Sequence, residues 1–292
     1  GLNAAFIDVG SKKAGFLHYL DLGLYYKALE KFTKICMSGG GDSMDFAKLK
    51  EPKLEKSGKI VETLKQGQVI LVQVSKEAIS TKGPRLCTEI SFAGRYLVLV
   101  PFSEKVSVSQ KIKSAEERNR LRKLIKSIKP DNFGIIIRTI AEGKSVAELD
   151  ADLKDLLSKW ESIKKKLPKA LPPTKLVSEL DKSSVILRDM LTEEFNNVYV
   201  NDADLYEELK GYISSICPEK EDILHLYKMQ TPIFEQFGVA SQIRNSFGKV
   251  VTIRSGIYLI IEQTEAMHVI DVNSGHRSKS SQDQEENALI GN

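Results

Sequence analysis

The sequence predicts a mixed α+β protein with several domains. The chain has 292 residues, and since a domain usually holds roughly 100–200 residues, more than one is expected. Short β-branched runs that predict strands dominate residues 1–101, whereas amphipathic segments that predict helices alternate with strands further along. Hydrophobic residues make up 41% of the chain and charged residues 28%, an ordinary balance for a chain that buries a core.

Charge and cysteine content narrow the class of protein. The formal net charge of +4 is too small to establish a nucleic-acid partner by itself. Cys36, Cys87 and Cys217 lie far apart, which excludes a disulfide scaffold and a local zinc knuckle. Without a signal peptide or a long apolar run, no membrane span is expected and the cytoplasm is the expected compartment. The abrupt strand pattern at 4–10 and the acidic stretch at 283–289 favour a fragment of a longer protein.

The first hundred residues are predicted to hold short strands around an irregular segment. Residues 4–10 and 15–17 predict a strand, a turn and a second strand. Residues 23–66, with Gly39-Gly40-Gly41 and many lysines, predict a long mobile insertion. Three more strands are expected at residues 67–76, 85–92 and 95–102.

Helices become prominent after Pro101. Apolar residues at helical spacing predict a basic helix over 114–128, followed by a buried strand over 133–140. Ser145 and Glu148 form a capping box that predicts a long helix to residue 167. The remaining elements expected are strands at 176–180, 198–200, 249–253, 258–263 and 266–272, and helices at 183–192, 203–216 and 234–247.

The opening strand pair resembles the strand-turn-strand of an OB-type barrel of the kind repeated in ribosomal protein S-one. Such barrels bind single-stranded nucleic acid by stacking bases on exposed aromatic rings, with nearby Lys or Arg on the phosphates. Phe6 and Phe16 would lie on neighbouring strands, and Lys82 on a loop of the same barrel. The alternative, that both phenylalanines are core residues, stays open and is slightly favoured on these residues alone.

Two further patterns suggest phosphate and metal chemistry. Arg138 and Thr139 end a strand, and a guanidinium fork with a hydroxyl suits a terminal phosphate, although an ordinary surface arginine is the commoner explanation. Asp271 and Asn273 would share one strand face, a donor set that suits Mg²⁺. Glu265, six residues before Asp271, is expected on that face too. A strand-end Asp that only forms a turn is the alternative.

These patterns occur in an order that resembles the bacterial ribonuclease E/G family, and the resemblance covers essentially the whole chain. The stretches that carry it are AAFIDVG at 4–10, GQVILVQVSKE at 67–77, GRYLVLVP at 94–101, IIIRT at 135–139, WESI at 160–163 and, most specific, TEAMHVIDVNSG at 264–275. The resemblance implies an α+β multidomain fold. The implied domains are an OB-type RNA-binding barrel at 1–92 lacking its first strand, an α/β 5′-sensor at 93–172, a ribonuclease H-like region at 173–248, and the truncated start of a deoxyribonuclease I-like nuclease domain at 249–292.

The resemblance also implies roles for individual residues. Phe6, Phe16 and Lys82 match positions that hold single-stranded RNA. The positions that match the site for the 5′-monophosphate of the substrate are Gly94, Val98, Arg138 and Thr139. The positions that match the catalytic centre are Asp271 as an Mg²⁺ ligand, Asn273 as its supporting amide and Glu265 as an acidic neighbour.

The implied activity is Mg²⁺-dependent internal cleavage of single-stranded, A/U-rich RNA in ribosomal RNA processing and RNA turnover. The second metal aspartate and the Cys-Pro-x-Cys segment that links protomers through zinc are expected beyond residue 292. This chain is therefore expected to bind RNA without cleaving it, and the full-length protein to be a homo-oligomer. The alternative function is a non-catalytic single-stranded RNA-binding protein. A ribosome- or polymerase-associated OB module would leave the run from Asp271 to Ser274 unexplained.

Overall fold

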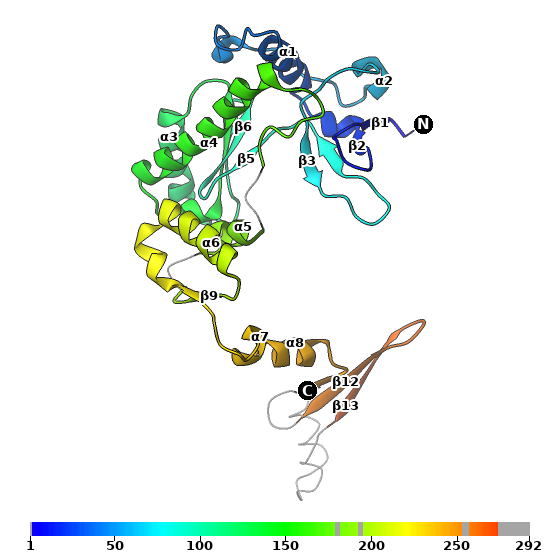
Figure 1. The fold of residues 1–292 in the computed structure, drawn as a ribbon, viewed down its shortest axis with the longest axis vertical. Coiled ribbons are helices and arrows are strands. Elements are labelled where there is room, and N and C mark those ends of the chain that lie inside the picture. The colour runs from blue at the N-terminus through cyan, green and yellow to red at the C-terminus, as the bar shows by residue number, and fades with distance from the viewer. Residues whose placement is uncertain (1, 179–181, 192–194, 253–256, 274–292) are drawn as a thin grey trace, which may run out of the picture. The chain divides into compact units, whose positions relative to one another are not determined.

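The computed structural model describes residues 2–178, 182–191, 195–252 and 257–273. The chain divides into an N-terminal unit, Gly1–Leu191, and a C-terminal unit, Thr192–Asn292, each described separately here (Figure 1). In the described residues the strands form four small sheets with helices between them, which confirms the mixed α+β class. No helix in these parts of the chain is long and apolar enough to span a membrane.

The first sheet has the strand order β1-β2-β4-β3. Antiparallel pairing joins β1 to β2 and β3 to β4, while β2 and β4 run parallel. Its outer strands β1 and β3 do not pair with each other, so the described strands form an open sheet and not a closed barrel. The strands are β1 (Ala4–Ile7), β2 (Gly15–His18), β3 (Gln73–Lys76) and β4 (Arg85–Cys87).

The strand predicted over 67–76 is shorter than its composition suggests. Only β3 joins the ladder, and residues 67–72 are irregular. Ile70 and Val72 nevertheless pack against the small core built around Leu17 and Leu86. The apolar run therefore reflects burial in this core, which does not require strand pairing.

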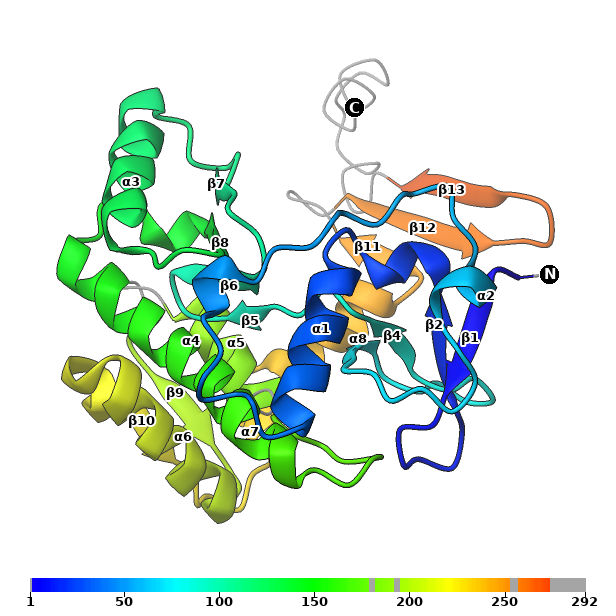
Figure 2. The same cartoon turned by 90° about the horizontal axis from the view of Figure 1, so that it is seen from above.

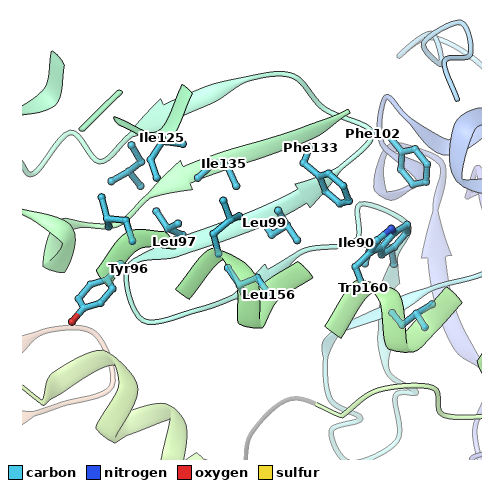
Figure 3. Packing of buried hydrophobic residues seen from close by; sticks show 14 of the residues in the cluster. Ile90, Tyr96, Leu97, Leu99, Phe102, Ile125, Phe133, Ile135, Leu156 and Trp160 are labelled. Atoms are coloured by element: carbon cyan, nitrogen blue, oxygen red, sulfur yellow. The ribbon is translucent and has the colours of Figure 1, made fainter. Parts of the chain in front are cut away.

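The second sheet forms the centre of the N-terminal unit, in the order β5-β6-β8-β7. Its strands are β5 (Phe92–Ala93), β6 (Leu97–Pro101), β7 (Val106–Val108) and β8 (Phe133–Ile137). Alternate residues of β6 and β8, among them Leu97 and Ile135, are fully buried in one cluster with side chains of α3 and α4 (Figure 3). Ile136, on the opposite face, is exposed.

Helices α3 (Ala115–Ile128) and α4 (Val146–Lys166) confirm the helices predicted over 114–128 and from Ser145 to residue 167, and both views show them side by side (Figures 1 and 2). Ser114 caps α3, and its Oγ accepts the N–H of Glu117. The capping box of α4 forms as predicted, because Glu148 Oε2 accepts the N–H of Ser145 at 2.9 Å. Sequence-local signals thus suffice for the starts of these helices.

The prediction of a mobile insertion over 23–66 is wrong for its first part. Residues Tyr26–Met37 form the helix α1, whose Leu29, Phe32 and Cys36 are buried in the main core. Their spacing of three and four residues places them on one helix face. Further along, α2 (Ile60–Thr63) is a single turn.

An aromatic cluster attaches α1 to the second sheet and α4. Trp160 of α4 is 1% exposed, and its ring stacks on Phe32 with 4.6 Å between ring centroids. Phe46, Phe102 and Phe133 also lie against Trp160, as Figure 3 shows for the last two. Through Phe46, the segment that follows α1 also packs against Trp160.

The N-terminal unit ends with α5 (Lys182–Met190), in agreement with the helix predicted at 183–192. The strand predicted at 176–180 is not observed at residues 176–178, and residues 179 and 180 lie outside the described residues.

In the C-terminal unit, β9 (Val198–Val200) and β10 (Leu224–Leu226) pair in parallel across the connecting helix α6 (Ala203–Ile216). Strand β10 was not predicted. The helix predicted over 234–247 is broken at Gly238, whose φ of 67° lies in the left-handed region. The two pieces are α7 (Ile233–Gln236) and α8 (Val239–Phe247).

The last sheet is antiparallel, with the order β11-β12-β13. Its strands are β11 (Val250–Thr252), β12 (Tyr258–Gln263) and β13 (His268–Asn273). Residues 264–267 turn the chain between β12 and β13, closed by a hydrogen bond from Thr264 N to Met267 O at 2.9 Å. This hairpin presents Asp271 and Asn273 near the end of β13.

Candidate nucleic-acid interface

An aromatic pair lies on the first sheet. Phe6 of β1 stands directly opposite Phe16 of β2, and their rings meet edge to face with 5.9 Å between centroids. Phe6 is 70% exposed and Phe16 is half-buried, whereas the neighbouring Leu17 is fully buried. The core interpretation therefore does not hold for Phe6, whose ring is available for stacking.

The hairpin that carries Lys82 lies beside the turn between β1 and β2. Lys13 Nζ in that turn donates to Ser80 O of the hairpin at 2.7 Å. A Cβ added to Gly83 would lie 2.1 Å from Ala14 O, so only glycine permits this close approach. Lys82 itself is exposed, with its backbone paired to Ile79. The structure thus brings a basic hairpin to the loop that joins the two aromatic strands.

A cleft of about 1640 Å³ opens in the N-terminal unit, with Phe6 and Arg188 both in its lining. Lysines outnumber carboxylates among the side chains that line this cleft, and an excess of positive charge attracts ligands that carry phosphate. The charged side chains that also line the cleft are Lys65, Lys76, Lys159, Lys175 and Lys182 against Asp8 and Glu77.

The four residues predicted for the 5′-phosphate meet at one end of the second sheet. Arg138 follows β8, and its Nη1 donates to Gly94 O at 2.8 Å. Val98 pairs with Ile136, two residues before Arg138. The hydroxyl of Thr139 lies 2.9 Å from Ser109 Oγ, an exposed pair.

Two carboxylates, those of Asp189 and Asp152, accept hydrogen bonds from the N–H groups around this end of the sheet. Arg138 Nη2 donates to Asp189 Oδ1 at 2.7 Å, and Arg188 Nε donates to the same oxygen at 2.9 Å. Burial raises the pKa of Asp189, but the hydrogen bonds from the two arginines outweigh it and leave the pKa below its usual value. No local sequence pattern indicates this contact, because Arg138 and Asp189 are 51 residues apart.

The second carboxylate, Asp152 of α4, binds the backbone between Gly94 and Val98. Its oxygens accept the N–H groups of Arg95, Tyr96 and Leu97 at 3.0, 3.0 and 2.9 Å. Burial raises the pKa of Asp152, while these three hydrogen bonds act in the opposite direction. The three N–H groups between Gly94 and Val98 thus hold an internal carboxylate.

We expect Asp152→Asn to lower the free energy of unfolding by about 1–3 kcal/mol, since an amide cannot satisfy three converging N–H donors and adds a donor of its own. Urea denaturation followed by circular dichroism measures the change. Asp155→Asn, an exposed neighbour on α4 paired with Lys159 at 2.6 Å, is the matched control. A loss for Asp152→Asn no larger than that of the control would contradict the role of this carboxylate.

The predicted catalytic residues lie on β13. Asp271 and Asn273 share one strand face, and Asn273 Nδ2 donates to Asp271 Oδ2 at 2.9 Å. This hydrogen bond orients the carboxylate of Asp271, a residue that is exposed. Carboxylate oxygens are ligands that Mg²⁺ prefers, so Asp271 fits as one ligand of the ion.

Glu265 does not lie on that face. It is in the hairpin turn, whereas Asp271 sits opposite Ile260 further along β13. The expectation that Glu265 and Asp271 share a strand face is therefore wrong, because a count of six residues assumes an unbroken strand. Within the described ranges, no group of three or more His, Cys, Asp or Glu side chains could hold a metal ion.

The sequence of the chain is similar to those of known ribonucleases. The sequence model of the "Ribonuclease E/G family" matches residues 91–292. The chain is 36% identical to ribonuclease G of Haemophilus influenzae over 275 residues, covering 94% of this chain and 52% of that protein. Ribonuclease G of Escherichia coli gives 36% identity and covers 94% and 53%, and ribonuclease E of Nostoc gives 36% over 285 residues, covering 96% and 38%.

The chain therefore belongs to the ribonuclease E/G family, as its motifs suggested. It spans about half the length of the ribonuclease G relatives that it matches.

Proposed function

We propose that this chain is part of an Mg²⁺-dependent endoribonuclease that cleaves single-stranded, A/U-rich RNA internally and senses a 5′-monophosphate. The observation that carries the proposal is the exposed Asp271, oriented by Asn273, on a strand of a chain that belongs to this family. The proposed domains are an OB-type RNA-binding domain at 1–92, a 5′-sensor at 93–172, a ribonuclease H-like domain at 173–248 and the start of a deoxyribonuclease I-like nuclease domain at 249–292.

RNA binding is assigned to the first sheet. A base stacks on the exposed ring of Phe6, and Phe16 holds that ring from the side. Lys82 and the lysines of the adjacent cleft contact the phosphates without reading sequence. This arrangement suits single strands, since a base must be unpaired to stack on a side chain.

Recognition of the 5′ end is assigned to the end of the second sheet. Arg138 offers a fork of N–H donors, and Thr139 offers a hydroxyl beside Ser109. The carbonyl of Gly94 accepts a hydrogen bond from Arg138 Nη1 and so holds the guanidinium in place. A terminal phosphate carries more charge than an internal one, and a guanidinium fork favours it for that reason.

Catalysis is assigned to Asp271, which would hold Mg²⁺ together with carboxylates from the remainder of the protein. The bound ion would lower the pKa of a water molecule and neutralise charge on the phosphodiester. Asn273 keeps the Asp271 carboxylate in position through its amide hydrogen bond. We assign no catalytic role to Glu265.

The wider setting follows from the same proposal. The full-length protein would act in the cytoplasm as a homo-oligomer, on ribosomal RNA precursors and other transcripts. A non-catalytic RNA-binding protein is the second candidate, favoured by the single acidic side chain, Asp271, on the described face of β13.

The RNA-binding assignment predicts that Phe6→Ala weakens binding of a single-stranded A/U-rich oligonucleotide by about 1–3 kcal/mol, the value of one stacked base. Because Phe6 is 70% exposed, the melting temperature should change little. Fluorescence anisotropy and thermal denaturation measure the two effects. Phe247→Ala removes a ring that is 87% exposed on α8 and serves as the control. Unchanged RNA affinity in Phe6→Ala would refute the stacking role.

A further inference from the structure

Positive charge is concentrated in the segment that contains α3. Residues 111–129 hold eight Lys or Arg side chains against two Glu, a net charge of +6, whereas the whole chain carries +4. The remainder of the chain is therefore slightly acidic. A cluster of one sign of charge on one element creates a local potential that the mild overall charge conceals.

Three of these cations are neighbours on the surface of α3. Arg122, Lys123 and Lys126 are three or four residues apart or adjacent, a spacing that places them on one side of the helix. Lys123 and Lys126 are exposed and Arg122 is half-buried. Arg122 Nη1 donates to the neutral amide oxygen of Asn119 at 3.0 Å. We call Arg122, Lys123 and Lys126 the basic face of α3.

The basic face differs from the exposed side of α4 in how its charges are balanced. On α4, Lys154 Nζ lies 2.6 Å from Asp150, four residues away. On α3, no position three or four residues from Lys123 or Lys126 holds a carboxylate, and no described residue forms an ion pair with either lysine. Protein surfaces that only need to be soluble usually intersperse both signs of charge. The charge on this face is therefore available to an external anion.

The start of α3 lies beside the residues assigned to the 5′ end. Ser109 Oγ, shortly before the helix, is 2.9 Å from the hydroxyl of Thr139. Glu117 Oε1, in the first turn of α3, accepts the N–H of Gly143 at 2.9 Å, which ties the helix to the loop that follows Thr139. At about 1.5 Å per residue, the basic face begins about 8 Å and ends about 14 Å further along the helix axis. An RNA strand bound at Thr139 can reach it within a few nucleotides.

RNA phosphates fit this face better than an anionic membrane does. Leu121 and Ile125, on the other side of α3, are fully buried in the main core. The helix therefore has no free apolar face to enter a bilayer, as membrane-surface helices do. Lysine and arginine contacts to RNA phosphates need only exposed positive charge.

We propose that the basic face of α3 is a second RNA-binding surface, which holds phosphates of nucleotides near the 5′ end without reading sequence. The inference rests on the proposed RNA-binding function and adds to it a site separate from Phe6 and from the cleft, whose described lining contains none of these three side chains.

The test measures binding of a 5′-phosphorylated, single-stranded oligonucleotide to the whole chain by fluorescence anisotropy at several salt concentrations. The variant Lys123→Gln/Lys126→Gln removes two exposed charges and keeps side chains that favour helix. The slope of log affinity against log salt should become shallower by about 1.4, and the affinity at about 0.1 M salt should fall roughly 25-fold, since each lost contact to a single strand contributes about 0.7. A/U-rich and mixed sequences should lose equally.

The matched control is Lys34→Gln/Lys154→Gln, which removes the same net charge from α1 and α4. Both lysines are paired at 2.6 Å, Lys34 with Glu30 and Lys154 with Asp150. This variant should leave the slope nearly unchanged. Lys126→Gln alone, with about half the expected change in slope, replaces the double variant should the latter not fold.

The outcomes separate this inference from the function on which it rests. A change in slope no larger than that of the control, while the unaltered chain binds RNA, would overturn the α3 surface and leave the proposed function in place. Absence of RNA binding by the unaltered chain would overturn both. Loss of binding to vesicles of anionic lipid, with an unchanged RNA slope, would assign the face to a membrane and would also overturn the inference. A shallower slope in the α3 variant alone supports it.

Discussion

In a version of the protein extended to the full length of its relatives, Asp271→Asn should abolish Mg²⁺-dependent RNA cleavage while leaving RNA binding nearly unchanged. The carboxylate is the ligand that β13 offers to the metal, and an amide holds Mg²⁺ far more weakly. Loss of a metal that activates water and compensates transition-state charge should lower the rate by at least roughly a thousandfold. The 292-residue chain by itself should bind the same RNA without cutting it.

A paired gel assay scores binding and cleavage on one labelled A/U-rich oligonucleotide. Glu262→Gln removes an exposed carboxylate from the adjacent strand β12, where it pairs with Lys249 at 2.8 Å, and should cleave normally. Glu265→Gln, in the hairpin turn, should also retain activity. Metal-dependent cleavage that survives Asp271→Asn would mean that the active site lies elsewhere. No cleavage by the extended, unaltered protein would favour the non-catalytic RNA-binding alternative.

The largest loss of stability is expected for Trp160→Ala, at about 3–5 kcal/mol, because a large aromatic side chain is removed from a closely packed core. The Trp160 side chain is 1% exposed and touches aromatic rings from α1, the second sheet and the segment between them. Urea denaturation followed by circular dichroism measures the loss. Leu171→Ala, at a side chain that is 83% exposed, is the control and should change little.

A double-mutant cycle isolates the contact with α1. Phe32 stacks on Trp160, and we expect a coupling of about 0.5–1.5 kcal/mol between Phe32→Ala and Trp160→Ala. Additive losses would show that α1 does not depend on this ring pair. A loss below about 1 kcal/mol for Trp160→Ala would contradict the central position of Trp160 in the core.

Local sequence patterns correctly predicted those features of the fold that depend on residues close together in the chain. The capping residues Ser114 and Ser145 start α3 and α4 where they were expected, since a cap acts within three residues. Alternation on β13 placed Asp271 and Asn273 on one face correctly. The motif order also identified the family, which the comparisons confirm over residues 91–292.

Three predictions were wrong because one local sequence pattern is compatible with more than one structure. The glycines and lysines of 23–66 concealed the helical spacing of Leu29, Phe32 and Cys36, which in hindsight indicates α1. The β-branched residues before Gln73 led to a predicted strand that is too long. β-branched residues are common in strands, but they also occur where side chains are buried and the backbone pairs with no other strand. The count that placed Glu265 beside Asp271 missed the turn between β12 and β13.

The sequence by itself determined the family, the α+β class, the main helices and the residue types of the candidate sites. Only the tertiary structure decided which anion each donor group meets. Asp152 reaches the backbone at Arg95 across 57 residues, and Asp189 reaches Arg138 across 51. Such pairs follow from the packing of helices against a sheet edge, because the free energy of a charge-assisted contact depends on distance in space and not on separation along the chain.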